Sequence, residues 1–157
     1  MYSYSNINEI DEEKAEKIHR NSIIIDTHCD TLIHLTPRPP ISVYFSSYFD
    51  VPREYAAADL GPNVTYPGMK GLGVRSDSLS VDIPKMYEGG QTCQVFSMWM
   101  EPEYKPERCV KHTMRMVDKF HSELEANSDK ISLTTTAEDI IEAKGEGRIS
   151  AMLSVES

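Results

Sequence analysis

The stretch Ile23-Ile24-Ile25-Asp26-Thr27-His28-Cys29-Asp30 decides the fold class of this chain. Three consecutive β-branched residues are typical of a buried strand, and the run ends at once in side chains that bind metals. Because strand side chains alternate between faces, Asp26, His28 and Asp30 are expected to share one side. His28 and Asp30 are therefore candidates for an imidazole–carboxylate pair at the C-terminal end of a parallel strand, where barrel enzymes carry their active sites. The alternative is a strand that runs into a polar turn, with Asp26 and Asp30 as turn or cap residues.

The composition is that of one folded, acidic domain. The chain has 157 residues, of which 39% are hydrophobic and 26% are charged. The net charge of −9 argues against nucleic acid or an anionic membrane as a partner. No run approaches the ~18 apolar residues of a transmembrane helix, and the polar N-terminus lacks the apolar core of a signal peptide. The three cysteines fit reduced thiols, so a cytoplasmic location is expected.

Residue patterns predict that strands and helices alternate along the chain. Strands are expected to start at Ile23, Thr92 and Ile149, and helices are expected over 9–20, 82–88, 106–126 and 137–144. Between the first strand and the second helix, residues 36–80 are rich in proline, glycine and aromatic residues. They are expected to form a long irregular insertion with one short helix near 52–59. The aromatic side chains of this insertion either pin it to the body of the protein or form the wall of a substrate pocket.

Two of the predicted helices carry specific signals. Thr136 and Asp139 predict a capping box at the start of the helix over 137–144. The helix that begins at Pro106 has the clearest amphipathic pattern, and its apolar stripe consists of Val110, Met114, Val117, Phe120 and Leu124. Two histidines of this helix lie off the stripe, and we expect both on the solvated surface; they are His112 and His121.

The long crossovers between the predicted strands indicate a parallel α/β sheet or barrel. Parallel strands need connections of this length, and helices usually supply them. Three strands are too few to close a barrel, and no helix follows the last strand to cover it. The sequence therefore predicts a single partial domain over 1–157, cut off part-way through its fold.

Four pieces of the chain, taken in order, resemble the zinc-dependent membrane (renal) dipeptidase family and its bacterial members. The pieces are Asp26–Asp30, Asp82–Pro84 with Gly89-Gly90 and Gln94–Phe96, Thr136–Ile140, and Ala151–Glu156. They cover nearly the whole chain outside the 36–80 insertion, and the chain departs from the family pattern at Thr27 and Ser157, where glycine is usual. The resemblance implies the N-terminal part, about three strands, of a (β/α)₈ TIM barrel of the metal-dependent hydrolase type.

The resemblance also implies a site with two zinc ions bridged by a glutamate and a water or hydroxide. It makes His28 and Asp30 ligands of the first zinc, Glu156 the bridging carboxylate, and Asp26 a residue behind the ligands that orients His28. Cys29 is expected to be a packed thiol on the other side of the strand. The remaining ligands, two histidines, and the catalytic aspartate are implied to lie beyond residue 157. No catalytic residue is therefore expected within this chain, which is expected to be inactive alone.

The activity that the resemblance implies is that of a hydrolase, a metallopeptidase that cleaves the peptide bond of dipeptides by a metal-bridging hydroxide. The expected partner is the dipeptide substrate, without nucleic acid or membrane, and a homodimer of the full-length protein is compatible with the sequence. Two alternatives remain open. One is another barrel amidohydrolase acting on cyclic amides or esters, against which His28-Cys29-Asp30 in place of the usual His-x-His argues. The other is a non-enzymatic metal-binding fragment.

Overall fold

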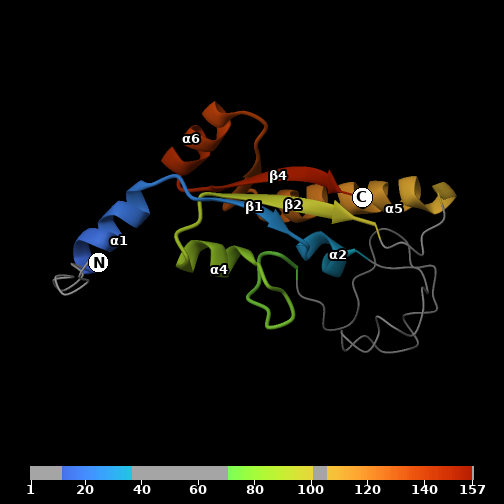
Figure 1. Cartoon of the computed structure of the whole chain (residues 1–157), viewed down its shortest axis with the longest axis horizontal. Helices are drawn as coiled ribbons and strands as arrows, with labels where there is room; N and C mark the ends of the chain where they lie inside the picture. The colour runs from blue at the N-terminus through green and yellow to red at the C-terminus, as the bar shows by residue number, and fades with distance from the viewer. Residues whose placement is uncertain (1–11, 37–70, 101–105, 157) are drawn as a thin grey trace, which may run out of the picture.

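A four-stranded parallel sheet forms the centre of the computed structural model, which describes residues 12–36, 71–100 and 106–156. In the order of their hydrogen bonding, the strands are β1 (Ile25–Cys29), β2 (Cys93–Trp99), β4 (Ile149–Glu156) and β3 (Ile131–Leu133). All three pairings are parallel, and the arrows of β1, β2 and β4 point the same way in Figure 1. The parallel α/β architecture predicted from the sequence is confirmed.

Helices precede or connect these strands. They are α1 (Glu12–Asn21), α2 (Thr31–Leu35), α4 (Ile83–Glu88), α5 (Pro106–Ala126) and α6 (Ala137–Gly145). The helices predicted over 9–20, 82–88, 106–126 and 137–144 correspond to α1, α4, α5 and α6, whereas α2 and β3 were not predicted. Both are too short for hydrophobic periodicity to reveal them. None of the described helices is long and apolar enough to cross a membrane.

Most of the predicted irregular insertion over 36–80 lies outside the described residues. Residues 71–80 are described, and they form turns and bends without helix or strand. The short helix near 52–59 and the aromatic residues of the insertion lie outside the described ranges, so their roles remain predictions.

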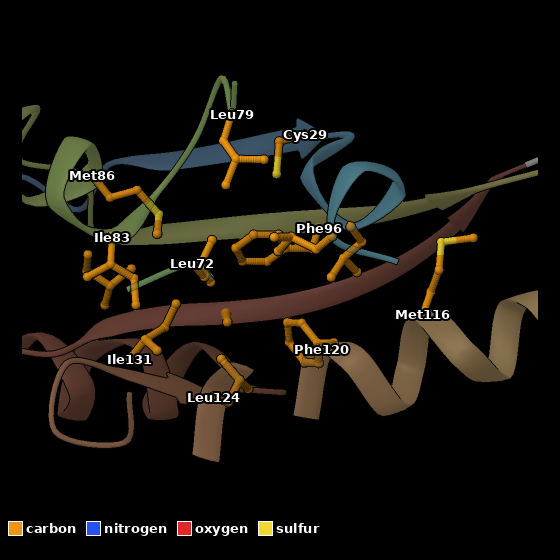
Figure 2. Close-up of a cluster of buried hydrophobic side chains, with 14 of the residues drawn as sticks. Cys29, Leu72, Leu79, Ile83, Met86, Phe96, Met116, Phe120, Leu124 and Ile131 are labelled. Carbon is orange, nitrogen blue, oxygen red and sulfur yellow. The ribbon is translucent and has the colours of Figure 1, made fainter. Parts of the chain in front are cut away.

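The core lies between the helices α2, α4 and α5 and one face of the sheet. Phe96 of β2 is fully buried, and its ring centroid lies 5.6 Å from that of Phe120 in α5. Figure 2 shows these two rings in one cluster with Ile83 of α4 and with Leu72, which precedes α4. Ala151 of β4 belongs to the same cluster and pairs in register with Gln94 of β2. The even-numbered positions of β2 thus face the helices.

The buried face of α5 differs from the predicted apolar stripe. Its buried residues are His112, Met116, Phe120, Glu123 and Leu124, whereas Val110 and Met114 are 71% and 52% exposed. The prediction that His112 is solvated was wrong, because this side chain is only 2% exposed; His121 is exposed, as predicted. The buried face of α5 also makes a polar contact: the carboxylate of Glu123 accepts a hydrogen bond from the backbone N–H of Leu72 at 2.7 Å. Hydrophobicity alone therefore could not identify the buried face.

The first strand is less buried than its sequence predicts. Ile23 is 44% exposed and Ile25 is 45% exposed, so the prediction of a buried strand was wrong for these residues. The reason is position, since β1 is at the edge of the described sheet and pairs with β2 alone.

The segment just before α4 approaches the end of α5 closely at Gly73. A Cβ atom added to Gly73 would lie 1.9 Å from Oδ1 of Asn127, which is 8% exposed. The side-chain amide of Asn127 is itself held, because its Nδ2 donates to the backbone oxygen of Glu123 at 2.8 Å. Glycine is therefore required at this position by contact.

We predict that Gly73→Ala lowers the free energy of unfolding by about 1–3 kcal/mol, since the added methyl group overpacks a buried contact. Gly145→Ala is the matched control, because a Cβ there meets nothing within 4 Å. The control is expected to leave stability unchanged or to raise it, as alanine favours the helix. Urea unfolding of both variants makes the comparison, and an equal effect of the two substitutions would contradict the predicted contact.

Candidate metal site

The C-terminal ends of β1, β2 and β4 meet at one edge of the sheet. Glu156 is the last residue of β4 and pairs in register with Trp99, the last residue of β2. His28 lies one residue before the end of β1, and Asp30 follows that strand directly. Because the strands are parallel, segments more than a hundred residues apart deliver these side chains to the same edge.

His28 lies between two carboxylates. Its Nε2 is 3.4 Å from Oδ1 of Asp30, and its Nδ1 is 3.4 Å from Oε2 of Glu156. One ligand atom from each of the three residues lies within 4.8 Å of the other two. The side chains of His28, Asp30 and Glu156 are 48%, 49% and 41% exposed, so solutes can reach them.

An irregularity in β1 sets the direction of His28. Asp26 pairs with Gln94 and Cys29 pairs with Phe96, so three steps along β1 match two steps along β2. An extra residue of this kind is a β-bulge, which re-aims side chains and is common beside active sites. It brings His28 to the face of Ser97, whereas the register pairs Asp26 with a residue of the opposite face. The prediction that simple alternation places Asp26 and His28 on one side was therefore wrong.

Asp26 nevertheless contacts His28 through the backbone. Its Oδ1 accepts a hydrogen bond from the backbone N–H of His28 at 3.1 Å. This contact constrains the main chain at His28 and does not reach the imidazole. That Asp26 orients His28 thus remains a prediction. The described contact would act on the backbone of His28 and not on its ring.

Asp30 tests the alternative in which the acidic residues only cap a helix. It occupies the N-cap position of α2, but its side chain makes no capping hydrogen bond. Its Oδ1 faces Nε2 of His28 instead. The cap explanation therefore accounts for the position of Asp30 along the chain and not for the direction of its carboxylate.

Cys29 lies in the core and not in the acidic cluster. It is 7% exposed and belongs to the buried hydrophobic cluster behind the sheet (Figure 2). Burial raises the pKa of its thiol to about 11. Since the thiolate is the form that binds metals, Cys29 is a poor ligand here. The prediction of a packed thiol is confirmed.

The site also contains two serines, Ser97 and Ser154, that were not predicted from the sequence. Ser97 Oγ lies 3.0 Å from Nδ1 of His28 and 3.0 Å from Oγ of Ser154. The position of Ser154, two residues before Glu156 in a strand, is a sequence signal that places both on one face. No comparable signal exists for Ser97, because its contact with His28 depends on strand register.

The donor set fits zinc. One imidazole and two carboxylates are common zinc ligands, and ligand atoms about 2.0–2.2 Å from a tetrahedral ion lie roughly 3.4 Å apart. The separation of 3.4 Å between Nε2 of His28 and Oδ1 of Asp30 has this size, while Glu156 approaches the other ring nitrogen, Nδ1, at 3.4 Å. Within the described ranges no other group of histidine, cysteine and acidic residues meets the same distance criterion. His34 belongs to α2, and His112 and His121 belong to α5, so none of these three histidines ends a strand.

The family follows from comparison with known proteins. The sequence matches the family described as membrane dipeptidase (peptidase family M19) over residues 12–157. The chain belongs to this family. No curated protein matches the chain significantly. Membership of the M19 family makes the chain homologous to metallo-dipeptidases and confirms the resemblance seen in the sequence.

Solved structures of dipeptidases and a metallopeptidase share the fold. Dipeptidase AC, a metallopeptidase of family M19, is 16% identical, with a TM-score of 0.56 over 86% of this chain and 35% of its own. The probable dipeptidase PvdM from Pseudomonas aeruginosa is 12% identical, with a TM-score of 0.54 over 91% of this chain and 30% of its own. A metallopeptidase from Rhodobacter sphaeroides, liganded with a phosphinate mimic of the dipeptide L-Ala-D-Ala, is 14% identical, with a TM-score of 0.57 over 86% of this chain and 38% of its own.

The described sheet corresponds to one part of each of these three larger structures. The chain spans about a third of the length of each of the three structures. Its parallel strands and helical crossovers form part of a (β/α)₈ barrel, as the sequence predicted. The cluster of His28, Asp30 and Glu156 lies at the C-terminal edge of these strands, which is where barrel enzymes carry their active sites.

Proposed function

We propose that this chain is part of a zinc-dependent dipeptidase, in which His28, Asp30 and Glu156 bind one zinc ion and Glu156 bridges to a second. The observation that supports it best is the convergence of these three side chains, from two distant strands, at the C-terminal edge of a parallel sheet. Because members of the M19 family are metallopeptidases, we interpret this cluster of side chains as a metal site.

Electrostatics supports a divalent cation among these residues. Asp30 and Glu156 both approach the same imidazole, so two carboxylates lie close together at a partly exposed edge. Two negative charges at this distance repel each other, and a divalent cation between them would offset the repulsion. Imidazole and carboxylate ligands suit zinc among the common biological metals.

Each described residue has a definite part in the proposed reaction. When bound, the zinc pair would make a water molecule acidic enough to attack near neutral pH and would polarise the scissile carbonyl. His28 and Asp30 would fix the first ion at the end of β1, and Glu156 would fix its position relative to β4. The edge is open to solvent, so a small substrate can reach it.

The remaining parts of the proposed site come from outside the described residues. Only one metal-binding cluster is present in the described ranges, and the chain spans 30–38% of the M19 structures. We therefore assign the ligands of the second zinc and the group that transfers the proton to other parts of the full-length protein. In this proposal no residue of the chain is itself the proton-transfer group, and the chain alone does not hydrolyse dipeptides.

The test of the proposed activity is an assay of the full-length protein that carries this sequence. We predict hydrolysis of simple dipeptides, including L-Ala-D-Ala, that a zinc chelator abolishes and added zinc restores. The phosphinate-bound relative is the reason to include that dipeptide. Hydrolysis of cyclic amides without dipeptide hydrolysis would favour another class of amidohydrolase. Dipeptide hydrolysis that survives complete metal removal would contradict the proposal.

A further inference from the structure

The hydroxyl group of Ser97 lies at the centre of a short hydrogen-bond chain behind the proposed ligands. Ser97 is 1% exposed, and its Oγ lies 3.0 Å from both His28 Nδ1 and Ser154 Oγ. Ser97 and Ser154 are register partners on β2 and β4, so both point to the face that carries Glu156. The chain therefore runs from the central strands of the sheet to the imidazole.

We infer that Ser97, supported by Ser154, is a positioning residue that holds the imidazole of His28 with Nδ1 towards the sheet and Nε2 towards the metal. The inference rests on the proposed metal site and adds to it which ring nitrogen binds and what fixes that choice. Neither serine is proposed to touch the metal or the substrate.

The chemistry of a neutral imidazole explains why such a residue is needed. Only one of its nitrogens has a lone pair for a metal, while the other carries a proton. A ligating histidine normally donates that N–H to a nearby oxygen, which fixes the tautomer and the ring orientation. Ser97 Oγ, at 3.0 Å, is closer to Nδ1 than is Oε2 of Glu156, at 3.4 Å. In this inference Nδ1–H donates to Oγ of Ser97, and the lone pair of Nε2 is left for a metal beside Asp30.

The second serine completes the arrangement. A hydroxyl that accepts from Nδ1–H can donate its own hydrogen to another acceptor, and Ser154 Oγ lies at 3.0 Å. Because Ser97 satisfies Nδ1, the carboxylate of Glu156 is released from that role and is available as a metal ligand. The opposite direction of the hydrogen bonds would leave N–H on Nε2, where it would block the metal.

Burial gives Ser97 its influence over an exposed ligand. Ser97 lies in β2, which pairs with strands on both of its sides, so its position is fixed by the sheet. His28 lies in an edge strand beside a bulge, and its side chain is 48% exposed. Without the contact to Ser97, the described polar contacts of the imidazole would be those to the partly exposed carboxylates of Asp30 and Glu156.

Calorimetric zinc titrations of the 157-residue chain test the effect on affinity. We predict that Ser97→Ala weakens zinc binding about 10- to 100-fold, as expected for loss of a partner of a ligating histidine. Ser154→Ala is expected to weaken it only about 2- to 10-fold, because it removes one neutral hydrogen bond from the end of the chain. Ser122→Ala is the matched control, since that exposed hydroxyl donates within α5, to the backbone oxygen of Asp118, and no change is expected.

A spectroscopic readout separates positioning from a general loss of structure. Nitrogen-15 NMR of the His28 ring is expected to show the proton on Nδ1 in the metal-free chain, and zinc on Nε2 after loading. In Ser97→Ala we expect a mixture of the two tautomers without metal. Zinc bound through Nδ1, or a Ser97→Ala variant with wild-type affinity and tautomer, would overturn the inference.

Two further outcomes are distinguishable. If the wild-type chain binds no zinc, the proposed metal site is wrong, while the tautomer of His28 in the metal-free chain still decides whether Ser97 orients the ring. If circular dichroism shows that Ser97→Ala does not fold, Ser154→Ala decides. Unchanged affinity and tautomer in that variant would then contradict the inference.

Discussion

Replacing His28 with alanine is expected to weaken zinc binding by the chain at least about 100-fold. His28 supplies the only imidazole of the cluster, and both carboxylates approach it at 3.4 Å. Its loss removes a strong ligand and leaves two carboxylates, which suit harder ions than zinc. Competition with a chromophoric zinc chelator at neutral pH measures the change.

His121→Ala is the control for this experiment. His121 is exposed on α5, away from the strand ends, so its substitution removes an imidazole from the chain without touching the cluster. Wild-type affinity is expected for this variant. An equal loss in both variants, or none in His28→Ala, would place the zinc elsewhere.

Asp82→Ala is expected to lower the free energy of unfolding by about 3 kcal/mol, the largest stability effect that we predict for the described residues. The carboxylate of Asp82 is fully buried and accepts hydrogen bonds from the backbone N–H groups of Ser76 and Lys85, each at 2.9 Å. The ammonium group of Lys85 lies 3.3 Å away. One side chain therefore caps α4 and orders the turn before it.

The control for Asp82 is Asp129→Ala. Asp129 is 73% exposed and contacts only its neighbour Lys130 among the described ion pairs, so its loss is expected to change stability by less than about 0.5 kcal/mol. Urea unfolding measures both variants. A loss below about 1 kcal/mol for Asp82→Ala would contradict the buried hydrogen bonds that we describe.

The effect of Asp82 is also expected to depend on pH. Burial acts to raise the pKa of Asp82, but the hydrogen bonds from Ser76 and Lys85 and the Lys85 ammonium outweigh it and hold the pKa below its ordinary value of 3.8. As pH falls, the unfolded chain therefore takes up a proton at Asp82 before the folded chain does. The stabilisation by Asp82 is fully present above pH 3.8 and is lost as pH falls through the lower pKa of the folded state. The stability difference between wild type and Asp82→Ala is expected to shrink below about pH 4.

Local signals in the sequence predicted the helix ends well. Thr136 and Asp139 form the expected capping box, with the hydroxyl accepting from the N–H of Asp139 at 3.1 Å and the carboxylate accepting from that of Thr136 at 2.9 Å. Such caps involve neighbours in sequence, so their residues carry the information. His28 and Asp30 were singled out by the strand that leads to them, whereas Glu156 was implied by the resemblance to the dipeptidase family.

Features that depend on contacts between distant segments were not predictable in this way. The bulge of β1 depends on how Asp26 and Cys29 pair with β2, and no residue type marks it. The contact of Ser97 with His28 follows from that register. The buried face of α5 depends on Glu123, a charged residue that hydrophobicity assigns to the surface but that accepts a backbone hydrogen bond from Leu72.

X-ray absorption at the zinc edge of the zinc-loaded chain tests the central claim most directly, because it reports which atoms surround the metal. We predict a first shell of nitrogen and oxygen at about 2.0–2.2 Å, with the outer-shell scattering of one imidazole and no sulfur. Glu156→Gln is expected to change this shell. A sulfur shell near about 2.3 Å would point to a cysteine, and absence of imidazole scattering would exclude His28. Either result would contradict a site built from His28, Asp30 and Glu156.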